Sequence, residues 1–251
     1  MIQLKSPREI EVMAEGGRIT AATIAMLRTV VKPGMSTLDL DAIAEEFIRG
    51  HDGATPAFKG LYGFPGTLCT SINNEIVHGI PSAKRVLQDG DLVSIDVGVG
   101  YKGLFTDSAA TVPVGRVDAE SARLLAVTVE ALEAGISAAT LGNYTGDIGL
   151  AVQTVVEAAG FSVVRELVGH GVGTAMHEEP QVPNYGKPKR GTKLVTGLTI
   201  AIEPMVNIGT PKTRTMPDRW TIVTADGSRS AHFEHTVAIV ENGPRVLTRA
   251  A

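Results

Sequence analysis

The sequence predicts an α+β fold in which helices pack on antiparallel sheet. Two observations carry this prediction. A long helix pattern, a shorter helix pattern and a run of strand patterns follow one another, and the same order is then repeated. Runs of helices followed by runs of strands are typical of α+β proteins. No low-complexity linker separates the two rounds, so residues 1–251 are expected to form a single domain of two related halves.

The first round opens with a clear helix start. Ser6-Pro7-Arg8-Glu9 is a capping box with proline at the first helical position. Apolar residues spaced by threes and fours continue this helix until Lys32-Pro33-Gly34 stops it. A shorter helix is expected from Ser36 to Gly50. The sequence after this helix predicts strands over 68–77 and 92–111.

The second round begins at Asp118 with another long helix pattern, followed by a shorter one that Gly160 closes. The two rounds align under a constant shift, which places Gly34 on Gly142 and Asp39 on Asp147. Strand patterns resume at 162–168, 198–202, 220–224 and 231–240.

Composition excludes several classes of protein. The hydrophobic fraction of 43% and the charged fraction of 20% argue against a disordered chain. A net charge of −4 argues against a general binder of DNA or of membrane surfaces. Cys69 is the only cysteine, which excludes an intrachain disulfide and a thiolate zinc cluster. With no signal-peptide pattern and no heptad repeat, a monomer in the cytoplasm is expected.

The first candidate for chemistry is a hairpin. Alternating aliphatic residues over 92–99 place Asp96 on the opposite side of its strand. If Gly100 pairs with Gly103 across the turn, Asp96 lies directly across from Asp107. Opposed like charges are destabilising, and no Lys or Arg occurs over 104–111. A divalent cation between the carboxylates is one interpretation, and a pair of exposed strand carboxylates is the other.

Further ligand-type residues lie in the second half of the chain. His170 stands among glycines, His177 follows it, and Glu203 and Glu234 interrupt aliphatic strand text. Each one alone is better explained by a structural role, such as a salt bridge for either glutamate. Two Asp, two Glu and one His together suit two divalent ions, whose charge four carboxylates balance.

Five motifs of the chain occur together in this order: 71–81 (SINNEIVHGIP), Asp96 with Asp107, 169–173 (GHGVG), 203–205 (EPM) and 233–236 (FEHT). In these motifs the sequence resembles a known family, type I methionine aminopeptidase. The resemblance spans nearly the whole chain. It implies the pita-bread fold, whose pseudo-symmetric halves agree with the doubled element order.

The resemblance implies a metal centre with two divalent ions, each Co, Mn, Fe or Zn. Asp96 would bind one ion, His170 and Glu203 the other, and Asp107 and Glu234 both. A hydroxide bridging the metals would attack the first peptide bond, and Glu203 would also shuttle a proton to the departing amine.

The resemblance also implies a substrate site. His78 and His177 would contact the scissile amide and its carbonyl oxygen. Phe64, Cys69 and Trp220 would line the methionine pocket, although ordinary core is the alternative for all of them. The implied substrates are nascent polypeptide N-termini with a small second residue. The basic stretch 187–193 is interpreted as a solvated loop, with a ribosome contact as the alternative.

Two other functions stay open at this level. An X-Pro aminopeptidase or dipeptidase of the same fold uses a similar set of ligands, although such enzymes usually carry an extra N-terminal domain. A non-enzymatic binding protein of this fold would be expected to lose ligands, whereas all the ligand types are present here.

Overall fold

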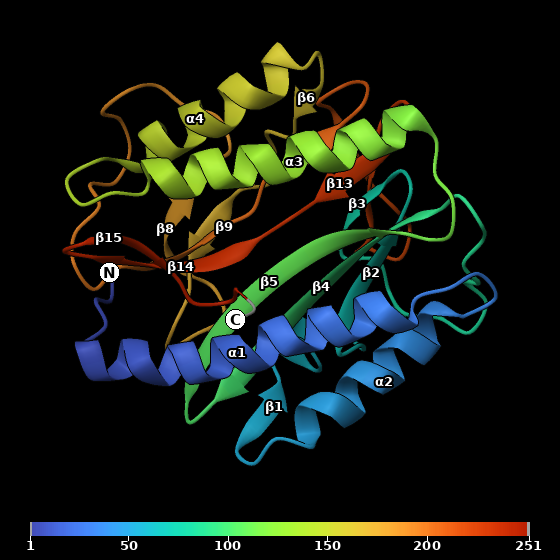
Figure 1. Cartoon of the computed structure of the whole chain (residues 1–251), viewed down its shortest axis with the longest axis horizontal. Coiled ribbons are helices and arrows are strands. Elements are labelled where there is room, and N and C mark those ends of the chain that lie inside the picture. The colour runs from blue at the N-terminus through green and yellow to red at the C-terminus, as the bar shows by residue number, and fades with distance from the viewer. Residues whose placement is uncertain (1, 250–251) are drawn as a thin grey trace.

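The computed structural model describes residues 2–249 and contains helices on one side of antiparallel sheets (Figure 1). The helices are α1 (Pro7–Val30), α2 (Thr37–Arg49), α3 (Ala119–Ala138) and α4 (Thr145–Ala158), with a 3₁₀ turn at Leu61–Gly63. The strands of the first half are β1 (Ala54–Pro56), β2 (Leu68–Ile72), β3 (Glu75–Val77), β4 (Leu92–Tyr101) and β5 (Leu104–Pro113).

The second half begins at α3 and holds the other strands. They are β6 (Ser162–Val163), β7 (Gly169–Gly171), β8 (Glu178–Val182), β9 (Thr199–Ile202), β10 (Met205–Asn207), β11 (Thr213–Thr215), β12 (Ile222–Thr224), β13 (Ser230–His232), β14 (His235–Val240) and β15 (Gly243–Val246). The α+β prediction is therefore confirmed.

The helix starts follow the chemistry predicted for them. Ser6 and Ser36 each form a capping box with the residue three positions on, and Asp118 caps α3 by accepting from Ser121 N. Such caps satisfy the free N–H groups of a first helical turn and fix where the helix begins.

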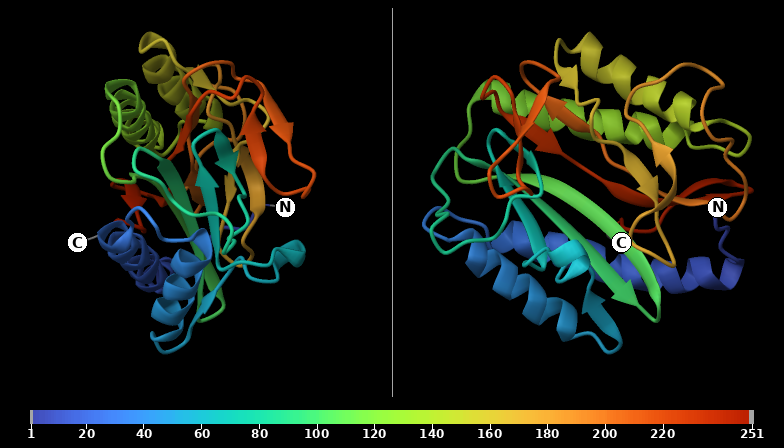
Figure 2. Two further views of the ribbon diagram at one scale, coloured as in Figure 1. Left: turned by 90° about the vertical axis from the view of Figure 1, so that its right-hand side faces the viewer. Right: turned by 180° about the vertical axis from the view of Figure 1, so that it is seen from behind.

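The two halves have similar layers. Within the first half, β4 pairs with β5 along one edge and with β2 and β1 along the other, and α1 packs on β4 and β5. In the second half the sheet order is β15-β14-β9-β7-β8, and α3 packs on β9, β10 and β13. Both long helices lie on the same side of the strands (Figure 2).

The halves meet where β5 runs beside β14, and hydrogen bonds join them there. The Thr236 hydroxyl accepts from Asp107 N at 2.9 Å and donates to Asp107 O at 2.8 Å. Glu234 N donates to Ala109 O at 2.9 Å. Two predicted metal ligands, Asp107 and Glu234, thus flank one seam.

The predicted register of the β4–β5 hairpin is wrong. Tyr101 pairs with Leu104, which leaves Lys102 and Gly103 as a two-residue turn with φ of 50° and 82°. Positive φ at both positions is the geometry of a type I′ turn, whose twist matches that of the strands. Asp107 therefore pairs with Gly98, and Asp96 with Ala109, so the two aspartates are diagonal neighbours instead of opposite residues.

Several predicted strands are divided in the structure. The pattern over 68–77 is broken at Asn73, whose φ is 56°, and 231–240 is broken at 233–234. Glu234 therefore stands in the link between β13 and β14, not inside a strand. His170, expected in a loop, lies on the short strand β7. None of the helices within residues 2–249 combines the length and apolarity that crossing a bilayer requires.

Candidate metal centre and substrate pocket

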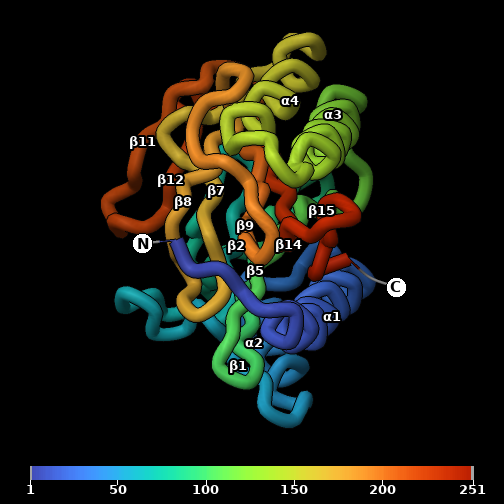
Figure 3. The backbone as a smooth tube through the Cα atoms, turned by 90° about the vertical axis from the view of Figure 1, so that its left-hand side faces the viewer, coloured from blue at the N-terminus to red at the C-terminus, as the bar shows by residue number. Residues whose placement is uncertain are grey.

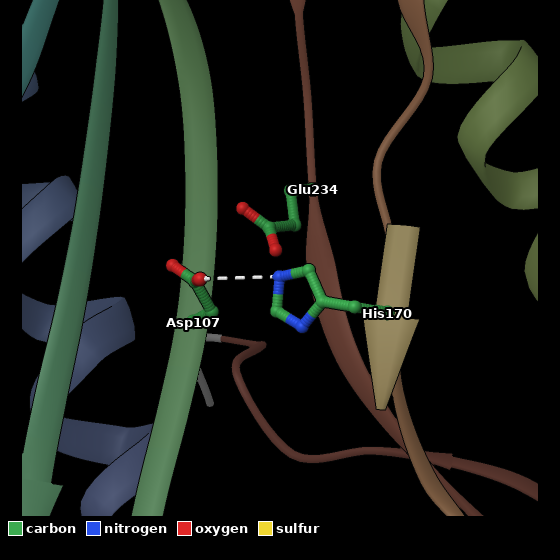
Figure 4. A group of neighbouring side chains, drawn as sticks. All are labelled: Asp107, His170 and Glu234. Atoms are coloured by element: carbon green, nitrogen blue, oxygen red, sulfur yellow. Dashed lines mark ion pairs between the residues drawn. The ribbon is translucent and has the colours of Figure 1, made fainter. Parts of the chain in front are cut away.

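The structure brings the predicted ligands together from strands far apart in the sequence. Asp107, His170 and Glu234 each offer a ligand atom, and these atoms all lie within 4.8 Å of one another. Their side chains point toward one another from β5, from β7 and from the link before β14 (Figure 4). His170 Nε2 lies 3.8 Å from Asp107 Oδ2 and 3.6 Å from Glu203 Oε1.

Asp96 completes the cluster from β4, and burial governs the charge of the carboxyl groups. Burial raises the pKa of Asp96 to about 6, and burial together with neighbouring carboxylates raises the pKa of Asp107 and Glu234 well above the usual range. Asp96 Oδ1, Asp107 Oδ1 and Glu234 Oε1 are buried without a hydrogen-bond partner. Within residues 2–249, the ion-pair partners of this cluster are histidines only.

This arrangement fits divalent cations. An uncompensated buried charge costs several kcal/mol per ion, and a cation among the oxygens offsets that cost. Carboxylate oxygen and imidazole nitrogen are the donors that first-row divalent metals accept. His170 Nδ1 lies 2.8 Å from Gly171 O, so Nδ1–H donates to that carbonyl and leaves the lone pair of Nε2 facing the cluster.

His78 reaches the same cavity from an unusual backbone conformation. Its φ is 60°, a left-handed value that non-glycine residues adopt at a cost. The next residue must be glycine, because a Cβ on Gly79 would lie 2.2 Å from Thr70 O. Burial lowers the pKa of His78, so its imidazole is neutral near pH 7.

His177 lies on the loop between β7 and β8, beside the cluster. Its ring is 4.5 Å from the His170 ring in an edge contact, and 5.8 Å from the Tyr62 ring in a stacked one. Desolvation by surrounding atoms, then the neighbouring His170, lowers the pKa of His177 to about 4, although part of the residue stays exposed. Sequence reasoning missed Tyr62, which is 74% exposed and has a φ of 52°.

The His177 loop is held by the N-terminal segment. Lys5 pairs with Glu178 Oε2, and both side chains are buried. Glu178 Oε1 accepts from Thr174 N at 2.6 Å and from Ala175 N at 2.9 Å. The segment before α1 runs beside β8 (Figure 3). No sequence pattern predicted this contact, because the partners are 173 residues apart.

An apolar cavity of about 310 Å³ adjoins the carboxyl cluster. The predicted pocket residues Phe64, Cys69 and Trp220 all line it, and the Phe64 and Trp220 rings meet edge to face at 5.1 Å. Burial raises the pKa of the Cys69 thiol well above its usual value, so it stays an uncharged, apolar wall. Phe58 and Tyr62, which the sequence did not suggest, also line it, as do Leu61, Met205 and His232.

The basic loop 187–193 lies apart from this cavity. Its Lys and Arg residues are exposed, and none of them lines the pocket. Lys189 N donates to Asp147 Oδ1 at 3.0 Å, which attaches the loop to the start of α4.

Comparison with known proteins agrees with this geometry. Residues 11–241 match the model of metallopeptidase family M24. This chain belongs to that family. M24 relatives named methionine aminopeptidase cover nearly its full length. The enzyme of Clostridium perfringens is 52% identical over 99% of both chains, and methionine aminopeptidase 1 of Bacillus subtilis is 52% identical over 99% of this chain and 100% of its own.

Solved M24 structures give the same picture. The crystal structure of methionine aminopeptidase from Thermotoga maritima has a TM-score of 0.97 at 44% identity, covering 99% of this chain and 100% of that one. The prolidase of Pyrococcus horikoshii, at 23% identity and a TM-score of 0.79, shares the fold. The match covers 99% of this chain but only 64% of that prolidase. The expected pita-bread fold and kinship with methionine aminopeptidases are confirmed.

Proposed function

We propose that this chain, acting as one catalytic domain over residues 1–251, hydrolyses the peptide bond that follows an N-terminal methionine. One observation carries the proposal. Buried carboxyl groups that no Lys or Arg within residues 2–249 neutralises lie beside an apolar cavity of about 310 Å³. The names of the M24 relatives support the same activity. Together they favour a metal-dependent exopeptidase with an apolar first pocket.

The donor set supports two divalent cations. Asp96 would hold one, His170 and Glu203 the other, and Asp107 and Glu234 would be shared by both. Such ions, when bound, supply Lewis acidity and lower the pKa of water so that a nucleophile exists near neutral pH. The oxygen and imidazole donors accept Mn, Fe, Co or Zn, and do not select one of them.

The side chains around the cluster supply the other parts of the reaction. Glu203 would take a proton from the attacking water and deliver it to the departing amine. His78 and His177 are neutral at the pH of reaction, so each has one N–H to donate to the scissile amide or to its carbonyl oxygen. Apolar residues of the cavity would bind the methionine side chain and exclude water, among them Phe64, Cys69 and Trp220.

The test compares a Met-Ala peptide with an Xaa-Pro peptide, each with and without a strong chelator. We expect cleavage of Met-Ala only, its loss on chelation, and its return when a divalent metal is added. Preferred cleavage of Xaa-Pro would instead assign the chain to the prolidase-like members of the fold. Metal binding without cleavage of either peptide would favour a binding protein.

The natural substrates proposed are nascent polypeptide N-termini with a small second residue. A cytoplasmic location and a monomeric state stay predictions. A ribosome contact through 187–193 is supported only by the exposure of its Lys and Arg residues.

A further inference from the structure

His232 is a buried histidine beside the carboxyl cluster with no assigned role. It ends β13, and its side chain is 2% exposed. Its backbone is fixed on both sides, because His232 N donates to the Thr111 hydroxyl at 2.8 Å and Thr111 donates back to His232 O at 3.0 Å. Among the residues that the structure describes, the imidazole Nε2 has no hydrogen-bond partner. A buried polar atom without a partner is rare in a native fold and calls for an explanation.

The group that His232 faces is Glu203. His232 Nε2 lies 3.6 Å from Glu203 Oε2, and His170 Nε2 lies 3.6 Å from Glu203 Oε1. The carboxylate therefore stands between two imidazoles, one oxygen toward each. His170 directs a lone pair at its oxygen, since its Nδ1–H is already donated to Gly171 O.

The main chain of Glu203 is fixed, whereas its carboxylate accepts no hydrogen bond from the residues that the structure describes. Asn184 Nδ2 donates to Glu203 O at 2.9 Å, and Pro204 follows directly. The ion-pair partner that faces Oε2 is the His232 imidazole, with Nε2 at 3.6 Å. A lone pair on His232 Nε2 would repel this carboxylate, so the tautomer with the proton on Nε2 is favoured.

We propose that His232 is a positioning residue whose Nε2–H donates a hydrogen bond to Glu203 Oε2, so that Oε1 is presented to the cation bound by His170. The gap of 3.6 Å exceeds a normal N–H···O distance by about half an ångström, which a small rotation of the Glu203 side chain closes. The inference rests on the proposed function, because it takes Glu203 to be a metal ligand. It adds which oxygen binds and what holds the other.

The test uses substitutions that differ in where they place an amide. In His232→Gln the amide nitrogen occupies the position of Nε2, whereas in His232→Asn it occupies that of Nδ1. His232→Leu removes the donor altogether. Each variant is stripped of metal and titrated with Mn²⁺ by calorimetry, and its Co²⁺ complex is examined by visible absorption. Circular dichroism and thermal unfolding verify the fold before titration.

We expect His232→Leu and His232→Asn to weaken Mn²⁺ binding by about 10- to 100-fold, the usual cost of losing a hydrogen-bond partner behind a ligand. His232→Gln should restore most of the affinity and the Co²⁺ spectrum of the unaltered protein. In turnover of Met-Ala peptides, His232→Leu should lower kcat more than it raises KM, because the proposed hydrogen bond acts on the metal ligand Glu203.

Two results would overturn the inference. Unchanged Mn²⁺ affinity in both His232→Leu and His232→Asn would leave the imidazole no influence on the metal. Affinity as poor in His232→Gln as in His232→Leu would mean that the nitrogen lone pair itself binds the ion. Should the leucine variant not fold, His232→Asn carries the test alone. Failure of the proposed function looks different, since the unaltered protein would then leave Met-Ala peptides uncleaved, whatever the Mn²⁺ affinities of the His232 variants.

Discussion

Glu178 and the pair Asp107 and Glu234 are all buried carboxyl groups, yet the chain treats their charges differently. Glu178 receives the Lys5 ammonium on one oxygen and backbone donors on the other. Burial alone would raise its pKa, but these contacts outweigh burial and hold the pKa of Glu178 below its usual value. Asp107 and Glu234 receive no Lys or Arg within residues 2–249, and their pKa values are raised.

Glu178 has a structural role, whereas Asp107 and Glu234 are candidates for a functional one. The chain itself supplies the hydrogen bonds and the counter-ion of Glu178, and these contacts stabilise the loop that carries it. A buried carboxyl group without such partners is neutralised by a proton, as its raised pKa indicates, or by a bound cation. Both groups border the same site, since Glu178 directly follows His177.

The largest effect is expected from neutralising Asp107 or Glu234, the carboxyl groups without a Lys or Arg partner within residues 2–249. Asp107→Asn or Glu234→Gln should lower kcat for a Met-Ala peptide by roughly three orders of magnitude, because each would remove a ligand that we propose the two ions share. The metal-free variant should be at least as stable as the metal-free parent, since a buried repulsive charge is gone. Steady-state kinetics and thermal unfolding in chelator measure both, and near-normal kcat in either variant would contradict a shared role.

Removing the ion pair between Lys5 and Glu178 should mainly lower the stability of the fold. Lys5→Met leaves Glu178 buried without its counter-ion, and we expect a loss of about 3–5 kcal/mol in the free energy of unfolding. KM should also rise, because the loop that carries His177 loses its anchor. Urea unfolding and peptide kinetics test this. The double variant Lys5→Met with Glu178→Gln is the matched control, and it should recover much of the stability.

Asp96, which belongs to the same carboxyl cluster, should make the stability of the metal-free protein depend on pH in an unusual direction. The folded pKa of Asp96 is about 6, above its unfolded value of 3.8, so its contribution to stability is present below pH 4 and is lost as pH rises through 6. The loss amounts to about 3 kcal/mol. Unfolding of chelated protein from pH 4 to 7, compared with Asp96→Asn, isolates it. A flat difference between the two would refute the raised pKa.

The smallest effect is expected at Tyr62, which belongs neither to the carboxyl cluster nor to the Lys5–Glu178 ion pair. Its exposed ring stacks on His177, and removal in Tyr62→Ala should raise KM about two- to tenfold, the equivalent of 0.5–1.5 kcal/mol of ring stacking. Stability should not change, because the ring is exposed. Tyr62→Phe keeps the stacking and serves as the control; equal KM in both variants would show that the contact is irrelevant to substrate binding.

Features that depend on interactions between residues close in the sequence could be predicted, whereas features that depend on distant residues could not. Caps at Ser6, Ser36 and Asp118 act within one turn, so the helix starts could be predicted. The turn over 100–103 has two glycines, and only the strand twist selects Lys102-Gly103 as its centre. The five candidate metal ligands were proposed from their motifs. The structure groups Asp107, His170 and Glu234 together, and Asp96 and Glu203 line the same cavity.

Other features of the site depend on contacts that no local pattern encodes. The Lys5 and Glu178 pair joins segments 173 residues apart. In the sequence His232 stands where the resembled family usually has glutamine, and no sequence pattern assigned it a role. Its importance appears only when β13 brings it against Glu203.

The junction of β5 with β14 gives the metal site a mechanical meaning. Asp107 and Glu234 lie on opposite sides of this junction, directly next to the Thr236 bonds that close it. An ion that both residues held would link the two halves of the molecule. Release of that ion would then be coupled to separation of the halves, so we expect the amides of Asp107 and Glu234 to exchange with deuterated solvent more slowly as the ion is held more tightly.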